Sequence, residues 1–153
     1  TGGTTRFTVA GPPHPGDAVK PHVLYCDGAS RGNPGPSAIG FVLYDSEGTP
    51  IAEVGGVIPE TTNNVAEYQA LISGLETALS QGVTNIEVRL DSLLLVKQVM
   101  GEYRVKAPHL KPLQRESVKL LTKFDHATID HVRREFNTVA DGLANEALDE
   151  VML

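Results

Sequence analysis

Apolar and polar residues alternate along much of the chain between residues 22 and 58, as they do in strands that bury one face. Three segments there are rich in β-branched, aromatic and other apolar residues, and they cover residues 22–26, 37–45 and 50–58. A Gly- and Pro-rich stretch separates the first two segments, and SerGluGly at 46–48 separates the second from the third. The pattern predicts a three-stranded antiparallel meander.

Helical and strand patterns alternate in the remainder of the chain. Residues 64–81 carry apolar side chains at helical spacing and end at Gly82, as a helix C-terminus does. Beyond it the patterns predict a strand at 85–90, helices at 92–100 and 110–124, a strand at 127–132 and a final helix at 138–149. Helices between strands imply right-handed crossovers and parallel pairing. We therefore predict an α/β fold with a five-stranded mixed sheet, three antiparallel strands plus two parallel ones, flanked by helices.

Length and composition suit one globular domain, because the chain has 153 residues and an ordinary share of apolar and charged ones. Residues 1–20 are rich in Gly, Pro and Thr without periodicity, so we expect a flexible tail or linker there and a single domain over residues 21–153. The one cysteine, Cys26, lies in an apolar run, which favours a buried thiol without a disulfide partner. Neither a signal-like leader nor an apolar run of about 18 residues occurs, so we expect a cytoplasmic protein that does not span a membrane.

Charge is distributed unevenly along the chain. The net charge of −6 argues at first against a nucleic-acid partner. Residues 89–134, however, hold ten of the thirteen Lys and Arg residues and five acidic residues, so the net charge of this segment is +5. The remainder of the chain holds three basic and fourteen acidic residues, so its net charge is −11. Four basic residues share one face of the expected helix 110–124, with Arg104 and Lys106 before it: Lys111, Arg115, Lys119 and Lys123. That face is either only solvated or a contact for a phosphate backbone.

Four acidic residues follow strand ends or begin helices, and each has an ordinary structural explanation. Asp27 could form an Asx turn after the first strand, and Glu67 could complete a capping box with Asn64. Asp91 could cap the helix that follows it, and Asp141 could favour the dipole of the last helix from its first turn.

The same four acids are placed so that the expected fold would bring them together. If the first and fourth strands are parallel neighbours, Asp27 and Asp91 emerge side by side at the carboxyl edge of the sheet, where ligands bind in open α/β sheets. Glu67 and Asp141 approach from flanking helices. Four carboxylates a few ångströms apart raise one another's pKa unless cations compensate them. Oxygen ligands without Cys or His favour Mg²⁺ or Mn²⁺, and a pair of such ions suits in-line phosphoryl displacement.

Four stretches of the sequence carry a resemblance to a known family, namely YCDGASRGNPGPSAIGFVL, TTNNVAEYQALISGLETAL, VRLDSLLLVKQV and NTVADGLANEAL. From about residue 22 to residue 149 the chain resembles a type I ribonuclease H, of the short-loop kind found in actinobacteria and archaea. The resemblance implies a ribonuclease H-like fold and places the catalytic, metal-binding acids on Asp27, Glu67, Asp91 and Asp141, which would hold two Mg²⁺ ions or Mn²⁺. It implies endonucleolytic cleavage of the RNA strand of RNA/DNA hybrids, with 5′-phosphate and 3′-hydroxyl products.

The resemblance also implies substrate contacts. Positions near the 2′-hydroxyl, which distinguishes RNA from DNA, match Gly32, Asn33, Asn63 and Asn64. Positions near the substrate backbone match Thr62, Asn63 and Ser92. The polar residues at the helix starts could equally be helix caps and nothing more.

An auxiliary catalytic residue is harder to place. The glycine-rich, histidine-bearing loop that many bacterial members carry before the last acid is absent from the segment HVRREFNTVAD. Arg134, seven residues before Asp141, resembles the arginine of short-loop members and is our candidate, although Arg133 and Arg134 could also be a solvated basic pair. His131 lies within an apolar run, which favours a strand residue over a catalytic one.

Three alternatives remain open from the sequence. They are another nuclease or recombinase on the same scaffold, an inactive module that only binds hybrids, and a nucleotide-binding α/β domain. The third is disfavoured because no GlyLys[Ser/Thr] follows the glycine-rich loop. We expect a monomer whose partner is an RNA/DNA hybrid. Some actinobacterial proteins of this kind continue into a phosphatase-like domain, which leaves an additional domain at either end of this chain open.

Overall fold

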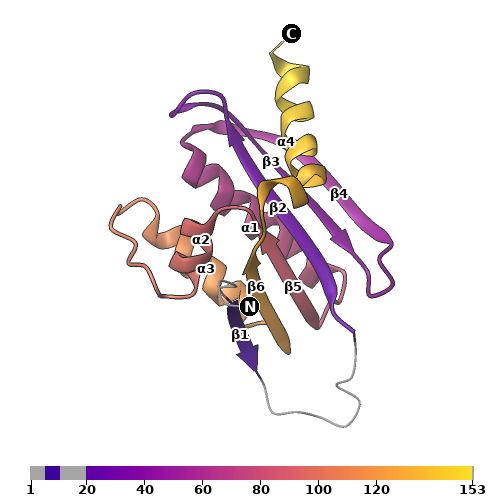
Figure 1. Cartoon of the computed structure of the whole chain (residues 1–153). Helices are drawn as coiled ribbons and strands as arrows, with labels where there is room; N and C mark the ends of the chain where they lie inside the picture. The colour runs from indigo at the N-terminus through magenta and orange to yellow at the C-terminus, as the bar shows by residue number, and fades with distance from the viewer. Residues whose placement is uncertain (1–5, 11–19, 153) are drawn as a thin grey trace.

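A mixed β-sheet lies between helices in the computed structural model, which describes residues 6–10 and 20–152 (Figure 1). The elements along the chain are β1 (Arg6–Ala10), β2 (His22–Ser30), β3 (Gly35–Tyr44), β4 (Pro50–Thr61), α1 (Asn63–Ser80), β5 (Asn85–Leu90), α2 (Leu93–Val99), α3 (Lys111–Leu121), β6 (His126–His131), the short 3₁₀ helix η1 (Arg134–Phe136) and α4 (Thr138–Val151). The strands are ordered β1-β6-β5-β2-β3-β4 across the sheet. The β5 strand pairs in parallel with both β2 and β6, and the other neighbouring pairs are antiparallel.

Helices cover both faces of the sheet. Figure 1 shows α4 across the front of β2 and β3, whereas α1 lies behind them. The main core joins the sheet to α1, α2 and α3 and contains fully buried Phe41 and Leu75, whereas a small cluster of Ala38, Ala144 and Leu148 joins β3 to α4. Neighbouring residues of β3 therefore belong to opposite cores, as the two-residue period of a strand requires.

The predicted five-stranded mixed sheet and its flanking helices are confirmed, and the structure adds one edge strand. Residues 6–10 form β1, which pairs antiparallel with β6, within the segment 1–20 for which we expected a flexible tail. This strand can form because an uncovered sheet edge presents free N–H and C=O groups with which an extended segment can pair. The sequence did not predict the strand, because five residues between Gly- and Pro-rich stretches are too few to show a strand pattern. The rest of the expected tail, residues 1–5 and 11–19, lies outside the described residues.

Some of the ordinary explanations for the acids are wrong, because the elements begin and end elsewhere. Asp27 lies inside β2 and not in an Asx turn. The N-caps of α1 and α2 are Thr62 and Ser92, whose hydroxyl oxygens each accept a backbone N–H from three residues further on. Neither Asn64 nor Asp91 therefore caps a helix.

Cys26 is buried in the main core, as predicted. Its burial, together with the neighbouring Asp27, raises the pKa of the thiol well above its ordinary value. His131 ends β6, so the strand interpretation of that residue is confirmed. Within the part of the chain that the structure describes, no helix is both long and apolar enough to cross a membrane.

Candidate active site

A cavity of about 270 Å³ opens where β2 and β5 approach their carboxyl ends. Ten residues line it: Asp27, Gly28, Ala29, Ser30, Asn63, Glu67, Asp91, Ser92, Arg134 and Asp141. The structure thus brings all four predicted acids to one place, together with the predicted auxiliary arginine. Two of the predicted substrate-binding residues lie there as well.

Parallel pairing of β2 with β5 sets the first two acids side by side. Cys26 lies opposite Leu90 in this pairing, so Asp27 and Asp91 are the next residues along two neighbouring strands that run in the same direction. Such strands end at one edge of the sheet, where their polar side chains face a common space. The sheet alone therefore supplies half of the acidic cluster.

Two glycines let helices come close enough to deliver the other two acids. A β-carbon on Gly28 would lie 2.2 Å from the carbonyl carbon of Ala66, and one on Gly40 would lie 2.2 Å from the carbonyl oxygen of Ala140. No other residue could occupy these strand positions without moving the helix backbone away. Because Ala66 precedes Glu67 and Ala140 precedes Asp141 in sequence, the close approach of α1 and α4 carries both acids to the cavity.

The acids interact strongly through their charges. Burial, together with the nearby Asp91, Asp141 and Glu67 carboxyls, raises the pKa of Asp27 to about 9. Burial likewise raises the pKa of Glu67 to about 7, which the repulsion of Asp91 supports, while a hydrogen bond from Ser92 and the charge of Arg134 act in the opposite direction. Without added positive charge, the site therefore favours a protonated Asp27 at neutral pH.

The donor set fits hard divalent cations, because carboxylate oxygens are the ligands that Mg²⁺ and Mn²⁺ prefer and no His or Cys lines the cavity. As the side chains stand, no group of three or more Asp, Glu, His or Cys among the described residues could hold a metal ion. The cavity matches such ions in the chemistry of its lining and in its location at the sheet edge.

Amide side chains hold two of the acids, Glu67 and Asp91, by hydrogen bonds. Asn63 donates from Nδ2 to Glu67 Oε1 over 2.5 Å, and Asn137 donates from Nδ2 to Asp91 Oδ2 over 2.9 Å. The same amide nitrogen of Asn137 lies 2.9 Å from the carbonyl oxygen of Cys26, so this buried residue connects β2 to the acid that follows β5. Asn137 was not among the predicted site residues, since an asparagine ahead of a helix looks like an ordinary cap. Its side chain makes no capping bond to α4.

The remaining predicted substrate residues surround the cavity without lining it. Gly32 has a φ of 111°, which favours glycine, and Asn33 accepts the backbone N–H of Asn63 over 3.0 Å, so the glycine-rich loop is tied to the start of α1. Thr62 serves as the α1 cap, as the alternative explanation had it. Asn64 is exposed and lines a separate groove of about 520 Å³, whose lining also includes Tyr103, Arg104 and Lys106.

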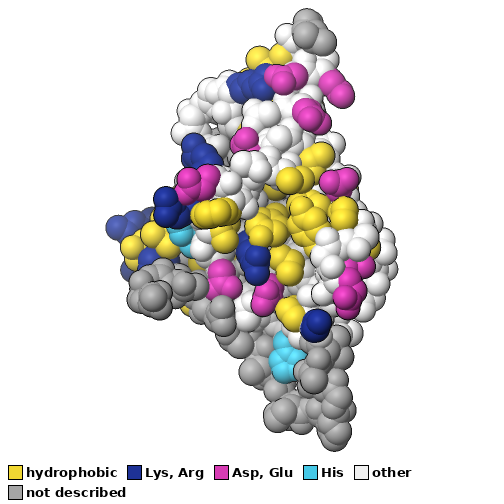
Figure 2. Space-filling model, turned by 45° about the vertical axis from the view of Figure 1, so that its right-hand side comes forward, with side chains coloured by type: hydrophobic (Ala, Val, Ile, Leu, Met, Phe, Trp, Pro, Cys, Tyr) yellow, Lys and Arg dark blue, Asp and Glu magenta, His cyan; other side chains and the backbone are white. Residues whose placement is uncertain are grey.

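Another hollow is larger than the acid-lined cavity, but none of the four predicted acids lines it. It has a volume of about 370 Å³ and lies beside the N-terminal end of α4, on the sheet face where Figure 2 shows hydrophobic side chains gathered. Tyr25, Tyr44, Phe136 and Val139 contribute to its lining. The candidate active site is the smaller, acid-lined cavity, since none of the four predicted acids lines this hollow.

Comparison with known proteins identifies the family. A family model described as "Reverse transcriptase-like" matches residues 25–147. Ribonuclease HI of Halobacterium salinarum is 46% identical over 149 residues, which are 97% of this chain and 73% of that protein. The bifunctional protein Rv2228c of Mycobacterium tuberculosis is 43% identical over 128 residues, which cover 83% of this chain but only 35% of the mycobacterial protein.

Solved structures agree with this assignment. The crystal structure of ribonuclease H1 from Halobacterium salinarum matches with a TM-score of 0.82 and 49% identity, over 84% of this chain and 98% of that one. LC11 ribonuclease H1 in complex with an RNA/DNA hybrid matches with a TM-score of 0.81 and 41% identity, over 86% and 99% of the two chains. A sheet of this topology, the acid-lined cavity at its edge and these relatives together place the chain in the ribonuclease H family.

Proposed function

We propose that this protein cleaves the RNA strand of RNA/DNA hybrids by metal-dependent hydrolysis and leaves 5′-phosphate and 3′-hydroxyl ends. The observation that carries the proposal is the meeting of Asp27, Glu67, Asp91 and Asp141 around one cavity at the sheet edge. The raised pKa values of Asp27 and Glu67 support a site that is completed by positive charge.

In this proposal the four acids hold two Mg²⁺ or Mn²⁺ ions, which would supply an activated water and stabilise the departing 3′-oxygen. Asn63 and Asn137 hold the carboxylates of Glu67 and Asp91 in place through the hydrogen bonds described above. Arg134 lies on the cavity wall and lowers the pKa of Glu67, so its cationic group is positioned to act on the acids or on a phosphate between them.

The loop and helix starts around the cavity would receive the hybrid. The bond from the Asn63 backbone N–H to Asn33 holds the loop that carries Gly32 against the helix start that carries Asn64. The groove beyond Asn64 continues past the exposed ring of Tyr103, which offers a stacking surface for a base.

The basic residues of α3, and Lys123 just after it, would contribute counter-charge, since Lys111, Arg115, Lys119 and Lys123 are all exposed. Neutralising phosphates releases condensed counterions, so binding should weaken steeply as salt rises. A duplex-binding role of this face predicts that charge reversal at Arg115 lowers hybrid affinity uniformly across sequences.

The test is a cleavage assay with three substrates of one sequence, namely an RNA/DNA hybrid, duplex RNA and duplex DNA, each with Mg²⁺, with Mn²⁺ and with EDTA. We expect cleavage of the hybrid's RNA strand only, dependent on metal, and none by the Asp27→Asn variant. Cleavage of the DNA duplex or equal cleavage of all three substrates would favour another nuclease on this scaffold. Hybrid binding without cleavage by the unmodified protein would favour an inactive binding module.

A further inference from the structure

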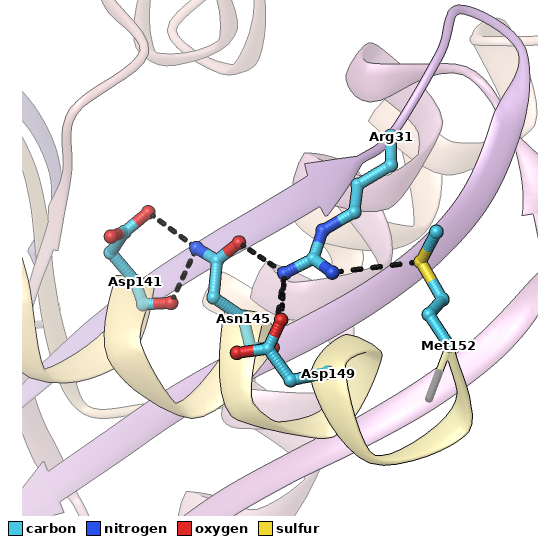
Figure 3. A network of polar contacts seen from close by, with 5 residues as sticks. All are labelled: Arg31, Asp141, Asn145, Asp149 and Met152. Carbon is cyan, nitrogen blue, oxygen red and sulfur yellow. Dashed lines mark hydrogen bonds and ion pairs between the residues drawn. The ribbon is translucent and has the colours of Figure 1, made fainter.

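A chain of polar contacts runs from the glycine-rich loop to one of the cavity acids (Figure 3). Arg31, at the start of that loop, reaches α4 and donates from Nη2 to the side-chain oxygen of Asn145 over 3.2 Å and to its carbonyl oxygen over 3.3 Å. Asn145 in turn donates from Nδ2 to Asp141 Oδ1 over 3.2 Å and to the Asp141 carbonyl oxygen over 3.0 Å. Two residues outside the cavity are therefore linked to an acid inside it.

The chemistry of the three groups fixes the direction of every contact. A guanidinium can only donate, so the end of the Asn145 amide that faces Arg31 must be its oxygen. The amide nitrogen then has to face Asp141, where it donates to the carboxylate.

The guanidinium itself is held at several points. Arg31 Nη2 forms an ion pair with Asp149 over 2.7 Å, and Nη1 lies 3.5 Å from the sulfur of Met152. At the other end, the Arg31 backbone N–H donates to the carbonyl oxygen of Pro36 over 2.8 Å, which closes the loop around it. The side chain thus joins a closed loop to the C-terminal half of α4.

We propose that Arg31 and Asn145 are positioning residues that orient the Asp141 carboxylate for metal binding and couple it to the loop that carries Gly32 and Asn33. The inference rests on the proposed function, because it needs Asp141 to be a metal ligand. A hydrogen bond to a ligating carboxylate is a common way to fix its orientation, and losing one typically lowers metal affinity about tenfold to a hundredfold. A purely structural role for these residues would lower stability and leave metal affinity unchanged.

The experiment measures Mn²⁺ binding by calorimetry in the absence of nucleic acid, together with thermal unfolding in EDTA. Asn145→Ala should weaken Mn²⁺ binding about tenfold, and Arg31→Met should weaken it by a smaller factor, about threefold, because Asp141 can still attract the amide. The double variant should bind like Asn145→Ala alone, since Arg31 acts through Asn145. Asp149→Asn is the matched control, because it removes an exposed ion pair but leaves the amide contacts, and its affinity should change less than twofold.

A second readout separates metal positioning from general damage. If the proposal holds, excess Mg²⁺ should restore most of the hybrid-cleaving turnover of Asn145→Ala. The isosteric Asn145→Asp variant keeps the packing of α4 but replaces the donor by a like charge, so it should also bind Mn²⁺ more weakly and serves if the alanine variant does not fold.

The possible outcomes distinguish the two proposals. Unchanged Mn²⁺ affinity in both Asn145 variants, or additive losses in the Arg31→Met and Asn145→Ala pair, overturns the positioning role while leaving the proposed function intact. Failure of the unmodified protein to bind Mn²⁺ or to cleave hybrids overturns the proposed function and this inference with it.

Discussion

Replacing Asp27 by Asn should stabilise the metal-free protein while it abolishes activity. The folded protein holds the pKa of Asp27 at about 9, mainly through burial and then through the nearby carboxyls, whereas its ordinary value is 3.8. The folded state therefore retains a proton that the unfolded chain releases. Asparagine keeps the shape of the side chain and carries no charge at any pH. The variant therefore avoids the free-energy cost of keeping the Asp27 carboxyl protonated in the folded state.

The magnitude follows from the two pKa values. Between them, each pH unit costs the folded state about 1.4 kcal/mol relative to the unfolded chain, which amounts to about 4 kcal/mol at pH 7. Relaxation of the cluster and entry of water reduce the realised gain, and we expect 2–4 kcal/mol, or roughly 10 °C in Tm for a domain of this size.

The sign of the pH dependence is also fixed. A carboxyl whose pKa is raised on folding makes stability fall as pH rises from about 4 to about 9, and the fall ends above the folded-state value. The Asn variant should lose most of this decline and keep only the part due to Glu67, whose pKa rises from 4.5 to about 7. Urea unfolding at pH 5, 7 and 8.5 in EDTA, followed by circular dichroism, measures both curves.

Two controls make the result decisive. Glu76→Gln removes an exposed carboxylate from α1, the helix that carries Glu67, and should change the free energy of unfolding by less than about 0.5 kcal/mol. Mg²⁺ should stabilise the unmodified protein and not the Asp27→Asn variant. Equal stability of the two proteins at pH 7 and at pH 8.5 would refute the claim that Asp27 is buried against other acids.

Three further predictions concern the scaffold. Gly40→Ala should lower the free energy of unfolding by at least about 3 kcal/mol and lower activity, because the added β-carbon would meet the Ala140 carbonyl. Gly56→Ala is the control, because Gly56 faces open space, and it should lower the free energy of unfolding by less than about 1 kcal/mol. Urea unfolding measures both changes. Tyr68→Phe should cost about 1 kcal/mol in the same assay, since the Tyr68 hydroxyl donates to Gln98 over 2.8 Å in the core. Cys26 should react with a thiol reagent only after unfolding, and rapid labelling of the native protein would contradict its burial.

The sequence predicted most of the elements because their signals are local. Apolar spacing located α1 and α4, alternation located β2 and β3, and a helix between strands implied the parallel pair β2 and β5. The last of these was enough to place Asp27 beside Asp91. The β1 strand escaped prediction because pairing with β6, over a hundred residues away in the chain, is what makes it a strand.

The supporting residues of the site could not be found in this way. Asn137 contacts the backbone of Cys26 and the carboxylate of Asp91, and Arg31 contacts Asn145, all far apart in sequence. Each of these residues looks ordinary in its own segment. Their hydrogen-bond partners become apparent only once α4 is packed against the sheet.

By itself, the sequence determined which residues could carry the chemistry, since carboxylates at strand ends and helix starts are visible in one dimension. The tertiary structure decided how closely they meet, because that distance depends on two glycines whose missing side chains matter only against the backbone of a distant helix. It also decided how the acids are oriented and how strongly they repel one another, since hydrogen bonds and charge interactions act through space and not along the chain.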